Sequence, residues 1–192
     1  DFFDGRGKDG LVAAGDAFSL APMDNGRWCR CPACRALIKE EADRGREEFS
    51  NDRASEYIFS FANKVAREVG KTHPDKQLTI LAYASYAYPP ERERLEPNLT
   101  VVFVHGIRPA NPVNREILRA WRETAPDNRL LVWLWYLNPM YDARLGNYHC
   151  FPGFFAHGVG DAFKAYSQHD VRGAFLEGLG QDVEVYVTCK LM

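Results

Sequence analysis

The sequence predicts an α/β fold in which about five parallel strands alternate with helices. Five apolar runs of strand length lie along the chain, and patterns of helical period separate most of them. A turn or a polar tip follows each run, as it does in βα units, and such units build a parallel sheet. The first predicted strand begins at Ala17, and the later ones cover residues 78–83, 99–104, 130–136 and 173–176.

The first predicted βα unit consists of the strand that begins at Ala17 and the helix that follows it. The strand begins at Ala17 and is closed by Pro22 and Gly26, which is typical of a short buried strand in a parallel sheet. Parallel sheets keep their chemistry at the carboxyl ends of their strands, so the turn after this strand is a candidate site. A charged helix is expected to follow over residues 33–48.

Apolar residues at helical spacing predict further helices. The first is capped by Asn51 or Asp52 and stops near Gly70, another spans residues 155–169, and the last spans residues 182–192. The residues expected to face inward are Ile58, Phe61, Ala62, Val65 and Val69, then Ile117, Leu118 and Trp121, then Val159, Ala162, Phe163 and Tyr166.

Two architectures fit this alternation, an open doubly wound sheet and part of a (β/α)8 barrel. Three glycines, Gly5, Gly7 and Gly10, precede the first strand, so they cannot form the phosphate-binding turn of a dinucleotide fold. A complete barrel needs about 250 residues, and this chain has 192. The barrel interpretation therefore requires a fragment.

The ends of the chain favour that interpretation, because it starts without an initiator Met and stops within a predicted helix. We expect residues 1–192 to form a single domain, the C-terminal part of a TIM barrel with strands four to eight. The rest of a larger polypeptide would complete the barrel.

Composition restricts the classes of partner. Of the 192 residues, 46% are hydrophobic and 26% are charged, which is ordinary for a globular domain. The net charge of −2 and the pI near 6.2 give no electrostatic support for nucleic-acid binding. The longest apolar run, residues 130–137, is too short to span a bilayer, so no membrane insertion is expected.

The stretch from Pro22 to Leu37 is similar to the signature of an uncharacterised bacterial domain family. It reads Pro-Met-Asp-Asn-Gly-Arg-Trp-Cys-Arg-Cys-Pro-Ala-Cys-Arg-Ala-Leu. That family, a domain of unknown function, is grouped with TIM-barrel glycoside hydrolases, near the alpha-glucuronidases and the beta-hexosaminidases. The resemblance extends to residues 57–68, 81–83 with 89–90, and 173–178, and Met23 departs from it, because Asn usually precedes the acid. It implies a carbohydrate-active barrel.

Two carboxylates lie at predicted strand tips, where barrel enzymes place their chemistry. Asp24 follows the first strand and Glu177 ends the last. Glycosidic hydrolysis needs a proton donor and a carboxylate that attacks or activates water. Partial desolvation near Phe175 suits Glu177 to the acid role, and the resemblance to hexosaminidases implies that Asn25, beside Asp24, orients the sugar. A turn for Asp24 and an exposed surface for Glu177 are the alternatives, and Asp142 is interpreted as a solvated loop residue.

Aromatic and planar polar groups near strand ends are candidates for sugar contact. The predicted substrate-binding residues are Asn25, Trp28, Tyr83, His105, Arg108, Trp135 and Tyr141. Alternation puts Trp133 on the same strand face as Trp135, and core packing is the preferred interpretation for Trp133. For His105 two interpretations are kept, a structural role and a hydrogen bond to the sugar. Arg108 could pair with an acidic sugar such as a uronate.

The chain has five cysteines, so at least one thiol is unpaired, and Cys189 in the last helix is the expected one. Cys29, Cys31 and Cys34 form a Cys-x-Cys-x-x-Cys motif, which could bind zinc together with the pair at 149–150. A second paired knuckle is missing, so a disulfide in an exported protein or free structural thiols is the preferred interpretation. Redox chemistry is the remaining alternative.

The leading prediction is an exported glycoside hydrolase that cleaves a polysaccharide or glycan without a cofactor. Asp24 and Glu177 would be its catalytic carboxylates. The first alternative is a non-catalytic barrel domain that binds glycan within a larger exported protein. The second is a zinc-stabilised interaction module.

Overall fold

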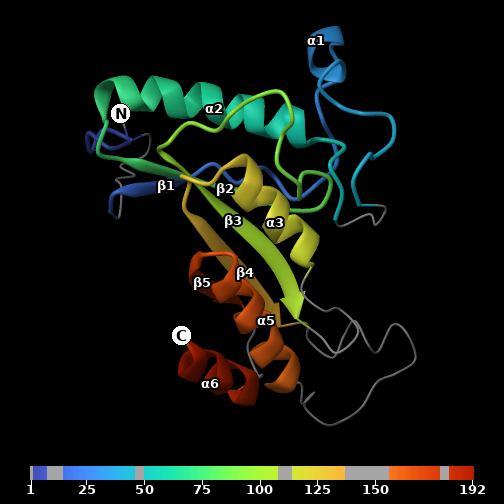
Figure 1. Cartoon of the computed structure of the whole chain (residues 1–192). Helices are drawn as coiled ribbons and strands as arrows, with labels where there is room; N and C mark the ends of the chain where they lie inside the picture. Colours follow the sequence, from blue (N-terminus) through green and yellow to red (C-terminus); the bar gives the residue numbers. More distant parts are fainter. Residues whose placement is uncertain (1, 8–14, 46–49, 108–113, 137–155, 178–181) are drawn as a thin grey trace. The chain divides into compact units, whose positions relative to one another are not determined.

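A computed structural model describes residues 2–7, 15–45, 50–107, 114–136, 156–177 and 182–192 of the chain. Its strands form one five-stranded sheet in the order β1-β2-β3-β4-β5 (Figure 1). The strands are β1 (Ala17–Ser19), β2 (Gln77–Ala82), β3 (Leu99–Ile107), β4 (Leu130–Tyr136) and β5 (Val171–Glu177). Each predicted strand is present, with bounds that differ from the prediction by no more than a few residues.

The order of the strands decides between the two predicted architectures. In a doubly wound sheet the strand order reverses, so some consecutive strands are not neighbours. Here every strand neighbours the next one along the chain, and β1 with β2 and β4 with β5 are parallel pairs. Consecutive βα units in a (β/α)8 barrel give this order, because each new strand is added beside the previous one on the same side of the sheet. The α/β class and the partial barrel are confirmed.

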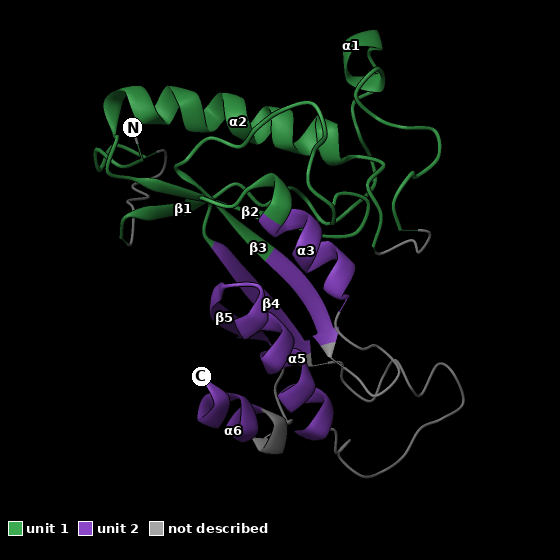
Figure 2. Cartoon of the chain, viewed as in Figure 1, with its two compact units in different colours: residues 1–102, 123–129 green, residues 103–122, 130–192 purple. Residues whose placement is uncertain are grey.

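The chain divides into two compact units (Figure 2). Unit 1 holds residues 1–102 and 123–129, and unit 2 holds residues 103–122 and 130–192. The division falls inside β3 and inside α3 (Arg115–Thr124). The tip of β1 therefore belongs to unit 1, whereas β4 and β5 belong to unit 2.

The core of unit 1 includes α2 (Ser55–Thr72) and β2. Every second residue of β2 is buried, as the strand period requires. The buried apolar residues of these two elements are Ile58, Phe59, Ala62 and Ala66 in α2 and Leu78, Ile80 and Ala82 in β2. Phe61 was expected to face inward, but its side chain lies on the other side of the helix and the residue is 59% exposed.

The predicted cap of this helix is also wrong. Ala54 occupies the N-cap position and makes no side-chain cap hydrogen bond. The side chains of Asn51 and Asp52 are used elsewhere, because Asn51 Oδ1 accepts the amide of Arg53 and Asp52 Oδ1 accepts the amides of two earlier residues. Both acceptors are engaged before the helix begins at Ser55.

The opening strand is present, but it is exposed rather than buried. All three residues of β1 are exposed, including Phe18 at 37%. Its registered partners on β2 are Gln77, Leu78 and Thr79. Because β1 ends the strand order, β2 is its one neighbour among the described strands.

A helix was predicted over residues 33–48, and within the described part of that segment, up to residue 45, it is reduced to the four-residue α1 (Pro32–Arg35). The reason is a tertiary contact that the local pattern does not contain. The buried carboxylate of Asp52 accepts the backbone amides of Asp43 and Arg44, at 3.0 and 3.2 Å. A residue in left-handed conformation, Gly45 with a φ of 67°, follows them. These amides therefore bond to a side chain instead of to helical carbonyls.

β2 and β3 are joined without a helix by residues 83–98, all of which the structure describes. The buried Asn63 of α2 holds this connection in place. Its Nδ2 donates to Glu93 Oε2 at 2.9 Å and to the Arg94 carbonyl at 3.0 Å, while its Oδ1 accepts the Glu96 amide at 3.0 Å.

Unit 2 contains most of α3, together with α5 (Ala156–Gln168) and α6 (Asp182–Leu191). The inward face predicted for α3 is confirmed, because Ile117, Leu118 and Trp121 are fully buried. The buried residues of α5 are Val159, Ala162, Ala165 and Tyr166. In the described ranges, no helix combines the length and the apolar character that crossing a bilayer requires.

Candidate functional site

The first candidate surface lies on β4 and β5 in unit 2 and consists of Trp133, Trp135, Phe175 and Glu177; we call it the Glu177 face. Val132 and Leu134 of β4 are buried, so the alternating Trp133 and Trp135 lie on the opposite strand face, where both are half-buried. The register of the two strands places Trp133 beside Phe175 and Trp135 beside Glu177. Phe175 is 57% exposed.

Trp133 connects the aromatic part of this face to the carboxylate. Its indole Nε1–H donates to Glu177 Oε2 at 2.7 Å, and its ring meets the edge of Phe175 with centroids 4.9 Å apart. Trp133 was expected in the core, and that prediction is wrong, because the residue faces away from the buried side of β4. The result is an exposed carboxylate held by an indole beside partly exposed rings, at the carboxyl end of β5.

The second candidate surface lies in unit 1 and is an aromatic cluster of Trp28, Tyr57, Tyr83 and Tyr86; we call it the Trp28 cluster. The Trp28 ring lies between two tyrosines, with centroid distances of 5.8 Å to Tyr57 and 6.2 Å to Tyr86. Tyr83 meets the edge of Tyr86 at 6.4 Å. Tyr57 was not among the predicted site residues, because it lies in the first turn of α2 and gives no sequence signal for a strand tip.

Asp24 lies beside this cluster in an exposed turn. Burial raises the pKa of Tyr86, and the nearby Tyr83 and the negative charge of Asp24 raise it further. The neighbouring Asn25 stabilises the turn. Its backbone N–H donates to the Met23 carbonyl at 2.8 Å, and its side-chain Oδ1 accepts the backbone N–H of Arg27 at 2.9 Å. The structure thus brings Asp24, Trp28 and Tyr83 into one region of unit 1.

Three cysteines follow Trp28 and converge. The sulfur atoms of Cys29, Cys31 and Cys34 all lie within 4.8 Å of one another. Hydrogen bonds from the Cys34 backbone, the Cys34 thiol and the Cys29 thiol lower the pKa of Cys31. Contacts with Cys31 and Cys29 raise the pKa of Cys34 to about 11. Each of the described cysteines is a free thiol, including the exposed Cys189.

His105 lies on the buried side of β3, only 5% exposed. Its Nδ1 is hydrogen-bonded to the Tyr166 hydroxyl of α5, and its ring stacks on Phe103 with centroids 6.1 Å apart. This position belongs to the core of unit 2. Two other predicted substrate residues, Arg108 and Tyr141, lie outside the described residues, as do Asp142 and the pair at 149–150.

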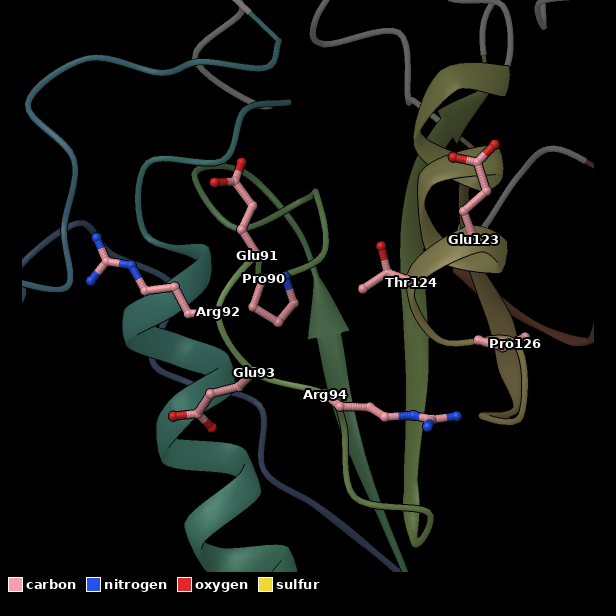
Figure 3. Close-up of a pocket in the computed structure, with 8 residues that line it drawn as sticks. All are labelled: Pro90, Glu91, Arg92, Glu93, Arg94, Glu123, Thr124 and Pro126. Atoms are coloured by element: carbon pink, nitrogen blue, oxygen red, sulfur yellow. The ribbon is translucent and has the colours of Figure 1, made fainter.

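A shallow cavity of about 360 Å³ lies in unit 1, along the connection between β2 and β3. It is lined by Pro90, Glu91, Arg92, Glu93, Arg94, Glu123, Thr124 and Pro126. Figure 3 shows the Arg94 side chain reaching toward the segment after α3, where it pairs with Asp127 at 3.0 Å. Glu93 points toward α2 and accepts a hydrogen bond from Ser60 at 2.9 Å. Charged residues that line the cavity, Arg94 and Glu93, are thus engaged in contacts within the protein.

A family comparison matches residues 13–192 to the domain of unknown function DUF4838. Because the match covers nearly the whole chain, the protein belongs to the DUF4838 family. No curated protein and no solved structure matches the chain significantly.

Proposed function

We propose that this domain forms part of a glycoside hydrolase active site, with Glu177 as the proton donor. The observation that supports this role most strongly is the hydrogen bond from Trp133 Nε1 to Glu177 Oε2 at 2.7 Å. An acid that protonates a leaving oxygen must be held in a fixed orientation and remain open to substrate. Glu177 meets both conditions, because the indole holds one of its oxygens and the residue is exposed. The desolvation near Phe175 that the sequence suggested is absent, so it does not contribute to this role.

The second carboxylate of the proposed mechanism is Asp24. Its proposed role is to attack the anomeric carbon or to activate water, which is the second carboxylate role in glycosidic hydrolysis. Asp24 follows β1 and Glu177 ends β5, so each stands at the carboxyl side of a strand, where barrel enzymes carry their catalytic groups. The two carboxylates belong to different units of the chain.

Aromatic surfaces accompany both carboxylates, and they favour a carbohydrate substrate. The apolar faces of sugar rings stack on aromatic rings, while the hydroxyl groups require polar partners close by. Trp135 beside Glu177 and Trp28 near Asp24 offer such rings, and both are half-buried. The proposal includes further strands from a larger, exported polypeptide, which would cover the exposed β1 and β5.

The test measures turnover by the protein on 4-nitrophenyl glycosides of N-acetylhexosamines and uronic acids and on polysaccharides. Glu177→Gln and Asp24→Asn remove the acid and the second carboxylate while they keep the size of each side chain. We expect each to reduce kcat by at least about 100-fold. The matched control is Glu68→Gln, because Glu68 is an exposed carboxylate on α2 that pairs with Lys71.

Full turnover in both Glu177→Gln and Asp24→Asn would overturn the proposed mechanism. Glycan binding without turnover in the unmodified protein, measured by calorimetry, would instead favour the non-catalytic glycan-binding domain. In that case Trp135→Ala should weaken binding, whereas Glu177→Gln should leave most of it, since stacking rather than proton transfer would hold the sugar.

A further inference from the structure

We propose that Cys29, Cys31 and Cys34 bind one thiophilic divalent cation of the zinc class, with water as the fourth ligand. The three sulfur atoms all lie within 4.8 Å of one another. Three thiolates on one zinc ion, each at about 2.3 Å, stand about 3.8 Å apart. A shift of about 1 Å or less in each sulfur, within the reach of a side-chain rotation, would therefore close the site around an ion.

The backbone around Cys31 arranges these sulfurs. Cys31 is the N-cap of α1 and has an extended backbone, with a φ of −63° and a ψ of 156°. Pro32 occupies the first helical position, where its fixed φ starts the turn. The single turn of α1 then returns Cys34 toward Cys31, which brings the sulfur atoms of the two residues within 4.8 Å of each other.

The surroundings of the cluster also favour a cation site. Cys29 and Cys31 are exposed and Cys34 is half-buried, so an ion can reach all three sulfurs from solvent. Three arginines, Arg27, Arg30 and Arg35, lie within two residues of a cysteine in the sequence. Their positive charge offsets part of the negative charge that three thiolates would carry.

A disulfide explains the geometry less completely. It would join two of the three sulfurs and leave the third without a reason to converge on them. A metal ion uses all three, which is what the arrangement of Cys29, Cys31 and Cys34 provides. Soft thiolate ligands select zinc and similar ions over magnesium or calcium, so the class of metal follows from the donor set.

A second group of potential metal ligands among the described residues differs from the cysteine cluster. Asp43, Asp52 and Glu91 also lie close together. The ammonium of Lys39 already lies among them, with Nζ at 2.7, 2.6 and 3.3 Å from the three carboxylates. A fixed cation therefore compensates the acidic group, while the cysteine cluster carries only thiols.

Metal binding would also fix the Trp28 cluster. Trp28 directly precedes Cys29, and its ring packs against Tyr57 with centroids 5.8 Å apart. An ion on the three sulfurs would restrain the loop that positions Trp28 between Tyr57 and Tyr86. This inference does not depend on hydrolysis, because it concerns the structure of the loop.

The test is a titration of the fully reduced protein with Co²⁺ and then Zn²⁺, with a phosphine reductant that does not bind metal. We expect a thiolate-to-cobalt absorption band in the near ultraviolet that saturates at one ion per chain and disappears when Zn²⁺ displaces the cobalt. Cys29→Ser, Cys31→Ser and Cys34→Ser should each weaken binding by at least about 100-fold. Cys189→Ser is the matched control and should bind like the unmodified protein.

A circular dichroism spectrum of each variant without metal separates a lost ligand from a lost fold. Weak binding in a folded Cys31→Ser variant, with normal binding in Cys189→Ser, would support the site. The proposal would be overturned if the reduced protein gave no thiolate-to-cobalt band. Undiminished binding in all three single variants would overturn it equally, because the ion would then lie elsewhere.

Discussion

Trp133 donates its indole N–H to Glu177 across the neighbouring strands β4 and β5, with 2.7 Å between Nε1 and Oε2. The two residues are not direct partners in the strand register, because Trp133 pairs with Phe175 and Trp135 pairs with Glu177. The hydrogen bond is therefore diagonal, between residues two positions apart on one face of the sheet, a separation that a long side chain can span. It gives the carboxylate a preferred orientation.

Replacement of Trp133 by Phe tests whether this orientation matters for the proposed hydrolysis. The variant keeps an aromatic ring against Phe175 and removes the donor to Glu177. We expect kcat to fall about tenfold, because one hydrogen bond to a charged group is lost. The free energy of unfolding should change by less than about 1 kcal/mol, since Glu177 is exposed and the ring that replaces the half-buried indole still packs against Phe175.

A double-mutant cycle provides the control for that prediction. If Trp133 acts through Glu177, Trp133→Phe should have no further effect on kcat once Glu177→Gln is present. Equal losses in both backgrounds would contradict the positioning role and would indicate that the indole contacts the substrate independently.

The ion pair between Asp52 and Lys39 should contribute to the free energy of unfolding. The Asp52 side chain is fully buried, and its Oδ2 lies 2.6 Å from Lys39 Nζ. Asp52→Asn leaves the ammonium without its buried partner, and we expect it to lower the free energy of unfolding by about 3 kcal/mol. Asp43→Asn is the control, because Asp43 pairs with the same ammonium but its side chain is 72% exposed. Its effect should stay below about 1 kcal/mol.

This ion pair also predicts a dependence on pH. Burial by itself would raise the pKa of Asp52, but hydrogen bonds from Lys39 and from the amides of Arg44 and Asp43 outweigh burial and hold that pKa below its usual range. The stabilisation is therefore complete above about pH 4 and is lost as the pH falls toward the folded-state value. Urea unfolding of the unmodified protein and of Asp52→Asn should differ most at pH 7 and converge in acid. A difference that grows in acid would contradict the assignment.

The strands could be predicted from the sequence because each is a local apolar run, and β4 has the bounds that its run predicts. The buried face of α3 could be predicted for the same reason, since Ile117, Leu118 and Trp121 recur at helical spacing. The local pattern left two architectures open, and the observed strand order agrees with the favoured one, the partial barrel, in which each strand neighbours the next. The helix predicted over residues 33–48 failed because the competing acceptor, Asp52, lies outside that segment.

The candidate site could be predicted only in part. The sequence indicates Glu177 and Asp24 as candidates because each stands at a predicted strand tip, and it indicates the cysteine motif by its spacing. Alternation placed Trp133 and Trp135 on one face, but it cannot tell which face is buried. That choice depends on the helices packed against the sheet, so the contact between Trp133 and Glu177 became visible only in three dimensions.

We predict that the single side chain of Asn63 holds the connection between β2 and β3 in place. It is fully buried and makes hydrogen bonds to Glu93, Arg94 and Glu96. Asn63→Ala leaves the partly buried carbonyl of Arg94 and amide of Glu96 without this partner, so we expect the free energy of unfolding to fall by about 2 kcal/mol. The neighbouring exposed Lys64 is the control, and Lys64→Ala should change stability by less than about 0.5 kcal/mol. Equal effects in chemical denaturation would contradict the bridging role of Asn63.

Two glycines predict opposite responses to the same substitution. Gly45 has a φ of 67°, and a Cβ there would lie 1.9 Å from the Ser50 carbonyl oxygen and 2.9 Å from Tyr88 Cε2. Gly45→Ala should therefore lower the free energy of unfolding by at least about 2 kcal/mol, since the left-handed backbone and the collision both oppose a side chain. Gly160 lies within α5, and a Cβ there meets nothing within 4 Å, so Gly160→Ala should raise stability by about 0.5 to 1 kcal/mol through its helix propensity. Thermal and urea unfolding of the two variants should shift in opposite directions, and a stabilised Gly45→Ala variant would contradict the backbone described around Gly45.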